Sequence, residues 1–177
     1  MISSGPSFRP LVIGTVVLAA LLAGGLWPDG TPVPEGIHAD RVVLHKSRRL
    51  LILFRKEQVL REYTVSLGRQ PTGPKEQEGD NRTPEGSYRL DSRMANSAYH
   101  RSLHVSYPNA EDSARAGQRG VSPGGAIFLH GLPNGLGWLG RWHRLLDWTR
   151  GCVALTNREI EELWQAVPAD TPIEILP

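Results

Sequence analysis

The sequence predicts a mostly-β domain with a few short helices. From residue 41 onward, short segments rich in β-branched residues alternate with turns containing glycine, proline or charged residues, as in successive antiparallel strands. The chain has 19 glycines and 14 prolines among 177 residues, which indicates many turns and argues against a helix bundle. Its 40% hydrophobic and 21% charged content is typical of a globular protein, and its length favours one domain.

The first part of the chain predicts export. Leu11–Leu26 is an uncharged apolar run that follows Arg9 and ends in small residues suited to cleavage, as in a signal peptide. The run is also just long enough to cross a membrane, so residues 1–27 are expected to be a signal peptide or an N-terminal membrane anchor. Residues 28–39 contain several prolines and are expected to form a semi-rigid linker to a domain over residues 40–177.

Six strands are expected before the last helix of the domain and a closing strand after it. A polar loop over Gly68–Pro84 interrupts them, and a loop of that length without regular structure is more often functional than a mere turn. The expected strands are Arg41–Lys46, Arg49–Arg55, Val59–Leu67, Gly86–Asp91, Ser102–Tyr107, Ala126–His130 and the closing Pro172–Leu176.

Two helices are expected. Residues 108–116 are predicted to hold a short helix that is capped by Asn109 and ended by Gly117. A clearer helix begins after Thr156, because Thr156 followed by Glu159 forms a capping box. Its apolar positions recur at helical spacing and Pro168 ends it. These positions are Ile160, Leu163, Trp164 and Val167.

Charge and cysteine content exclude several classes of protein. A formal net charge of +2 gives no general attraction to nucleic acid or to anionic lipid. The single cysteine, Cys152, rules out a disulfide within the chain and any zinc site built from several cysteines. An unpaired cysteine in an exported chain is either buried or chemically useful.

Cys152 and His130 are the candidate reactive residues. Cys152 follows Gly151 and precedes a short apolar strand, so its thiol is expected at the end of a sheet, where backbone N–H groups could form an oxyanion hole. His130 ends another apolar strand and is able to take the thiol proton. The alternatives are a small buried cysteine and a structural histidine. A metal site formed by His130, His143 and Cys152 matches no usual ligand spacing.

The segment around Cys152 resembles the catalytic signature of the L,D-transpeptidase (YkuD) family. That signature is a histidine, a loop, and then Ser/Thr-His-Gly-Cys, and here it reads His130, the loop Gly131–Trp148 and Thr149–Cys152. Upstream, Arg82–Tyr88 resembles the threonine-proline-x-glycine approach of the family into a strand. Two longer segments, VSLGRQPTGPKEQEGDNRTPEG and SPGGAIFLHGLPNGLGWLG, resemble the YafK-type branch. The similarity extends over residues 41–176.

The resemblance implies a β-sandwich-like fold with a lid loop, residues 131–148, over the active-site cleft. It also implies Cys152 as the nucleophile, His130 as the general base, backbone donors near Gly151 and Cys152 for the oxyanion, and Thr149 as a supporting hydroxyl. Arg150 stands where the family has a second histidine, so its guanidinium is either a contact for a substrate carboxylate or a solvated charge. The remaining candidates for substrate binding lie on the lid loop: Trp138, Arg141 and His143.

The resemblance further implies an exported cysteine acyltransferase that acts on peptidoglycan tetrapeptide stems through a thioester. The acceptor is expected to be an amine of a second stem or of a wall-linked lipoprotein, with no metal or organic cofactor, no nucleic acid, and membrane contact only through the N-terminal segment. The location is then the periplasm, or the inner membrane facing it. One alternative is a hydrolase that trims stems or releases wall-bound lipoprotein, and another is an inactive wall-binding module.

Overall fold

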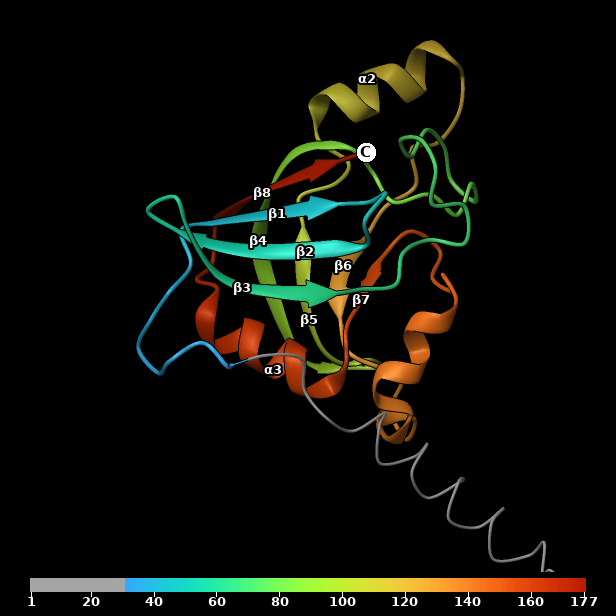
Figure 1. Cartoon of the computed structure of the whole chain (residues 1–177). Coiled ribbons are helices and arrows are strands. Elements are labelled where there is room, and N and C mark those ends of the chain that lie inside the picture. The colour runs from blue at the N-terminus through green and yellow to red at the C-terminus, as the bar shows by residue number, and fades with distance from the viewer. Residues whose placement is uncertain (1–30) are drawn as a thin grey trace, which may run out of the picture.

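The computed structural model describes residues 31–177 of the chain (Figure 1). The expected signal peptide or membrane anchor over residues 1–27 lies outside the described residues, as do the first residues of the expected linker. Within residues 31–177, no helix is both long and apolar enough to cross a membrane.

Eight strands are hydrogen-bonded into a single sheet, which confirms the mostly-β prediction. Its strand order is β3-β2-β1-β8-β4-β5-β6-β7, and the closing strand β8 lies in the middle, parallel to β1 and antiparallel to β4. In Figure 1, β4, β5 and β6 pass behind β1, β2 and β3 and cross their direction. The strands are β1 (Arg41–His45), β2 (Leu50–Arg55), β3 (Gln58–Thr64), β4 (Gly86–Ser97), β5 (His100–Val105), β6 (Ile127–His130), β7 (Val153–Ala154) and β8 (Thr171–Leu176).

The sheet curls until its two edges meet just beyond the end of β3. Ser66 and Ala154 of β7 form an antiparallel bridge, in which each N–H donates to the carbonyl of the other residue at 3.0 and 2.8 Å. One step further along, Gly68 forms a bridge with Thr149. The start of the loop 68–84 therefore lies against the segment that leads into Cys152.

The interior of the curved sheet holds the hydrophobic core. The alternating side chains of the strands point inward from both halves, as in Leu51 and Leu53 of β2 and Leu103 and Val105 of β5, and all four are at most 1% exposed. This arrangement explains why a sequence with short β-branched runs folds stably, since each strand contributes one apolar face to a shared core.

Within residues 31–177, three short helices lie outside the sheet. Helix α2 (Ala110–Gln118) has the predicted Asn109 cap but continues through Gly117, because the N–H of Arg119 bonds back to the last turn. Helix α3 (Asn157–Ala166) has the predicted capping box of Thr156 and Glu159 and packs against β5 and β6. The 3₁₀ segment η1 (Gly137–Leu145) lies in the stretch that the sequence predicts to be a loop, and Gly140 interrupts it with a kink.

Candidate active site

A pocket of about 670 Å³ opens beside the ends of β6 and β7. Its wall combines aromatic and apolar side chains with one thiol, one imidazole and two guanidinium groups. Four of the predicted site residues line it together, namely Cys152, His130, Thr149 and Arg150. The full lining is Arg69, Met94, Ser97, Ala98, Tyr99, Ser102, Phe128, His130, Trp148, Thr149, Arg150 and Cys152.

The pairing of β6 with β7 places His130 and Cys152 on the same side of the sheet. The two strands are parallel, and His130 is paired with Ala154. Side chains alternate between the faces of a strand, so Cys152, two residues before Ala154, returns to the face that His130 occupies. The thiol and the imidazole are therefore diagonal neighbours that both face the pocket.

The ring of His130 is fixed in orientation and in tautomer. Its Nδ1 lies 2.7 Å from the carbonyl oxygen of Gly131, so Nδ1–H donates and Nε2 remains the nitrogen that can accept a proton. Tyr99 packs against the ring at 4.5 Å between centroids, and Trp148 packs edge-on at 5.8 Å. Burial lowers the pKa of His130 below its usual value, although the bond to Gly131 opposes this, so the neutral base is favoured.

The Cys152 thiol lies in a partly closed environment. Its Sγ is 3.9 Å from the carbonyl oxygen of Ala126, a distance at which the thiol proton can be donated. Burial raises the pKa of this thiol, while the backbone N–H of Phe128 and the positive charge of Lys75 act to lower it. Without a base, the thiol would be mostly protonated at neutral pH, so a neighbouring imidazole matters for its reactivity.

A tight turn over residues 149–152 presents the thiol. The Thr149 hydroxyl donates to the Cys152 carbonyl at 2.7 Å and accepts from the Gly151 N–H at 3.1 Å. Thr149 therefore supports the backbone of the turn, and the Gly151 N–H is already used within it. Gly151 has a φ of +131°, and a Cβ there would lie 2.6 Å from the Arg82 carbonyl oxygen, so only glycine fits.

Two exposed arginines stand at the rim of the pocket beside this turn. The Arg69 N–H donates to the Thr149 carbonyl at 3.1 Å, which brings Arg69 next to Arg150. Both side chains line the pocket. Guanidinium groups in such a position are suited to a carboxylate on a bound molecule.

The three lid residues predicted to bind substrate are not among the pocket-lining residues. Trp138 is exposed on the 3₁₀ segment η1, and Arg141 is half-buried there. His143 is buried, with Nδ1 3.1 Å from the Ser66 hydroxyl and 3.5 Å from Trp148 Nε1. Their role in substrate binding stays a prediction, as does the opening of the lid.

Sequence reasoning did not single out Arg69, Tyr99 or Lys75. Arg69 reaches the pocket through the bridge between Gly68 and Thr149, and Tyr99 reaches it from the turn between β4 and β5. The only sequence signal for Arg69 and Lys75 was the unusual length of the polar loop 68–84. Within residues 31–177, no three or more His, Cys, Asp and Glu side chains gather in a group that could hold a metal ion.

The Cys152 thiol and the His130 imidazole line one pocket at one end of the curved sheet, and a thiol with a neighbouring base is the combination that nucleophilic thiol chemistry requires. The model of the YkuD family, the L,D-transpeptidase catalytic domain, matches residues 39–175. The chain therefore belongs to the L,D-transpeptidase family, as the resemblance in the sequence indicated.

Relatives of known name share this domain over part of their length. YafK of Escherichia coli (strain K12), named as a candidate L,D-transpeptidase, is 27% identical over 132 residues, which cover 71% of this chain and 46% of YafK. The structure of Bd1075 from Bdellovibrio bacteriovorus is 25% identical, with a TM-score of 0.56, over 84% of this chain and 54% of that one.

The helical cell shape determining protein Pgp2 from Campylobacter jejuni has the same fold. It is 23% identical, with a TM-score of 0.60, over 89% of this chain and 54% of that one. The chain thus spans about half the length of the relatives that it matches.

Proposed function

We propose that the protein is an exported L,D-transpeptidase that acts on peptidoglycan tetrapeptide stems through a Cys152 thioester. The observation that supports this most directly is the placement of His130 and Cys152 on one face of adjacent parallel strands, in one pocket, within a domain of this family. The expected location is the periplasm or the inner membrane facing it.

The proposed reaction has two halves. His130 Nε2 takes the thiol proton, and the Cys152 thiolate attacks the carbonyl of the diaminoacyl residue in the donor stem. The Cys152 N–H is placed at the turn where an oxyanion would form. The peptide bond then breaks, His130 returns the proton to the leaving amine, and D-alanine departs. In the second half, an acceptor amine gives a proton to His130 and attacks the thioester, which forms the new amide and releases the thiol.

The rim of the pocket supports a substrate with carboxylates. Arg69 and Arg150 lie at the entrance, and the aromatic side chains Tyr99, Phe128 and Trp148 form much of the wall. Stem peptides carry carboxylate groups on a largely aliphatic chain, so guanidinium groups at the rim and aromatic surfaces within match their chemistry. The Arg150 guanidinium is thereby assigned to substrate binding.

The test is incubation of the full chain with muropeptides that carry tetrapeptide stems, followed by mass spectrometry of the products. Dimers joined through two diaminoacyl residues are expected, and Cys152→Ala and His130→Ala should each reduce their yield at least 100-fold. His104→Ala is the matched control. His104 lies on β5, is paired with Asp91 of β4, and does not line the pocket.

The other outcomes decide between the remaining functions. Shortened stems without dimers, lost in Cys152→Ala, would make the protein a hydrolase that transfers the acyl group to water. Binding of muropeptides with no product from either the wild type or Cys152→Ala would make it a wall-binding module. Dimers from both proteins in equal yield would exclude Cys152 as the nucleophile.

A further inference from the structure

Lys75 is a buried lysine in the middle of the polar loop 68–84. Its side chain is only 4% exposed, although the loop lies at the surface and most of its residues are exposed or half-buried. The ammonium group donates to Asp80 Oδ1 at 2.8 Å and to the Gln77 carbonyl at 3.0 Å. Burial of a charged group is costly unless it is paired, so a lysine in this position requires an explanation.

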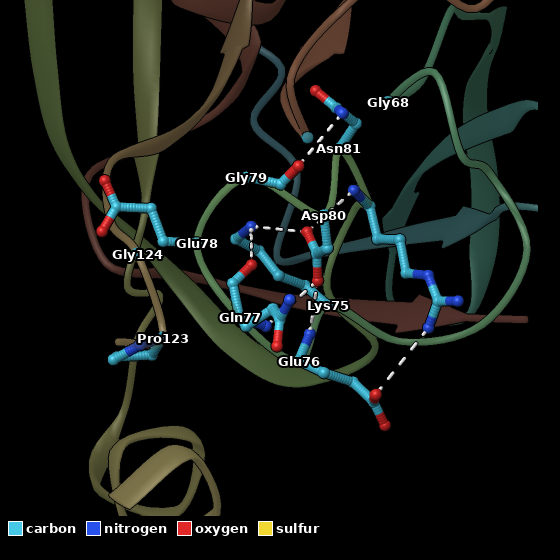
Figure 2. A network of polar contacts seen from close by, with 12 residues as sticks. Gly68, Lys75, Glu76, Gln77, Glu78, Gly79, Asp80, Asn81, Pro123 and Gly124 are labelled. Atoms are coloured by element: carbon cyan, nitrogen blue, oxygen red, sulfur yellow. Dashed lines mark hydrogen bonds and ion pairs between the residues drawn. The ribbon is translucent and has the colours of Figure 1, made fainter. Parts of the chain in front are cut away.

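Its partner, Asp80, organises the loop from within (Figure 2). Oδ2 accepts from the N–H groups of Glu76 and Gln77 at 2.7 and 3.1 Å, and Oδ1 accepts from the Arg82 N–H at 3.0 Å. Burial acts to raise the pKa of Asp80, but the bonds from Lys75 and from these N–H groups outweigh it and hold the pKa below its usual value. The ionised carboxylate therefore fixes the backbone on both sides of itself.

The residues that follow Asp80 lie directly against the turn that carries the nucleophile. A Cβ on Gly68 would meet the Asn81 carbonyl oxygen at 2.1 Å and the Gly151 Cα at 3.1 Å. A Cβ on Gly151 would meet the Arg82 carbonyl oxygen at 2.6 Å. Backbone packs on backbone at this place, so any movement of residues 81–82 would displace the residue next to Cys152.

The lysine side chain has a second link to the thiol. A Cβ on Gly124 would lie 3.5 Å from Lys75 Cε, so the lysine chain packs on the segment before β6. The Glu78 N–H donates to the Ser122 carbonyl at 2.7 Å and ties the loop to the same segment. Two residues beyond Gly124, the Ala126 carbonyl oxygen contacts Cys152 Sγ at 3.9 Å.

The ionisable groups near Cys152 lie in two places, the open pocket and the loop 68–84. Arg69, Arg150 and the neutral His130 line the open pocket, where solvent screens the two guanidinium groups. Lys75 lies in the loop that packs against the turn and is shielded from solvent, so its electric field is screened less than that of the two guanidinium groups. Its positive charge lowers the pKa of the thiol against the effect of burial.

We propose that the Lys75–Asp80 ion pair positions the nucleophile: it holds residues 81–82 against Gly151 and keeps a buried positive charge in the loop that packs against the Cys152 turn, where it stabilises the thiolate. Lys75 is thus a positioning residue and contacts neither substrate nor leaving group. The inference rests on the proposed role of Cys152 but is independent of the identity of the acyl acceptor.

The test is the pH dependence of Cys152 alkylation by iodoacetamide, measured on the full chain without any peptidoglycan. In Lys75→Met the pKa of the Cys152 thiol should rise, and the alkylation rate at pH 7 should fall by up to about tenfold. Lys75→Arg should restore most of the rate because it keeps the charge. Lys56→Met is the matched control, since Lys56 is an exposed lysine on the turn between β2 and β3, and its rate should equal that of the wild type.

Circular dichroism establishes that each variant is folded. A folded Lys75→Met with the wild-type pH profile would overturn the inference. If Lys75→Met does not fold, Asp80→Asn is used in its place. Slower alkylation of Cys152 together with faster amide exchange at Glu76 and Gln77 would support the proposal. An unchanged alkylation rate would overturn it. Because muropeptide turnover is measured separately, a failure of the proposed function leaves this result interpretable, and the reverse also holds.

Discussion

At the scale of single residues, Gly151 determines the shape of the turn that positions the Cys152 thiol. Gly151→Ala should lower the free energy of unfolding by about 2 kcal/mol or more, because a side chain at φ +131° is strained and its Cβ would clash with Arg82. Cys152 alkylation should also slow. The checks are chemical denaturation and the alkylation rate, with Gly117→Ala in α2 as control.

A Cβ on Gly117 would have nothing within 4 Å, so that change should be neutral or stabilise the protein by up to about 1 kcal/mol. Equal stability of the two alanine variants would contradict the assignment of Gly151 as the residue that the turn requires.

At the scale of elements, the start of α3 connects the nucleophile strand to the lid segment. Glu159 completes the capping box with Thr156 and also pairs with Arg144 of η1 at 2.5 Å. Thr156→Ala removes one helix cap and should cost about 1 kcal/mol in the free energy of unfolding. Since the helix lies beyond β7 and leaves the turn 149–152 unchanged, the alkylation rate of Cys152 should stay the same.

Thermal unfolding and the alkylation assay measure these two effects independently. A large loss of thiol reactivity in Thr156→Ala, with the protein still folded, would show that the cap also positions the nucleophile, contrary to this expectation.

At the scale of the whole molecule, packing of the lid segment on the sheet makes stability depend on pH. Burial lowers the pKa of His143 to about 4, and electrostatic interactions with Arg144 and with His130 add to this effect. The unfolded chain therefore binds more protons than the folded protein between pH 6.5 and 4. The contribution of the neutral, buried His143 to the free energy of unfolding is fully present above pH 6.5. It is lost as the pH falls, by about 3 kcal/mol between pH 6.5 and 4.

Urea denaturation from pH 7 to pH 4.5 measures this loss. His143→Gln lacks the titrating group, so its stability should depend less steeply on pH than that of the wild type. Parallel curves for the two proteins would show that His143 does not carry the pH dependence.

The sequence could predict those elements of the structure that have a local signal in the chain. Strand runs, the Asn109 cap and the capping box at Thr156 are local signals, and the structure confirms the elements that they predict. The extension of β4 to Ser97 had no such signal, because residues 92–96 are all exposed and Met94 is the one large apolar side chain among them, so that no apolar alternation marks a strand. The 3₁₀ segment η1 was missed because its glycines indicate a loop.

The residues of the candidate site also fall into those with a local sequence signal and those without one. Cys152 and His130 could be predicted because Cys152 follows a glycine just before one apolar strand, His130 ends another, and both match the family signature. Arg69, Tyr99 and Lys75 could not, because closure of the sheet or the shape of a loop brings them to the site. The sequence predicts that His143 binds substrate, and this role stays a prediction; its burial and its contact with Ser66 had no sequence signal.

The bridge between Ser66 and Ala154 has a consequence for folding. It joins segments that are distant in the chain, so its formation has a large loop-closure entropy, and we expect it to form late in folding. Before that step, Gly68 is not beside Thr149, residues 81–82 do not support Gly151, and the thiol has no defined surroundings. The Cys152 turn therefore gains its defined surroundings, with residues 81–82 packed against Gly151, only once the two edges of the sheet have met.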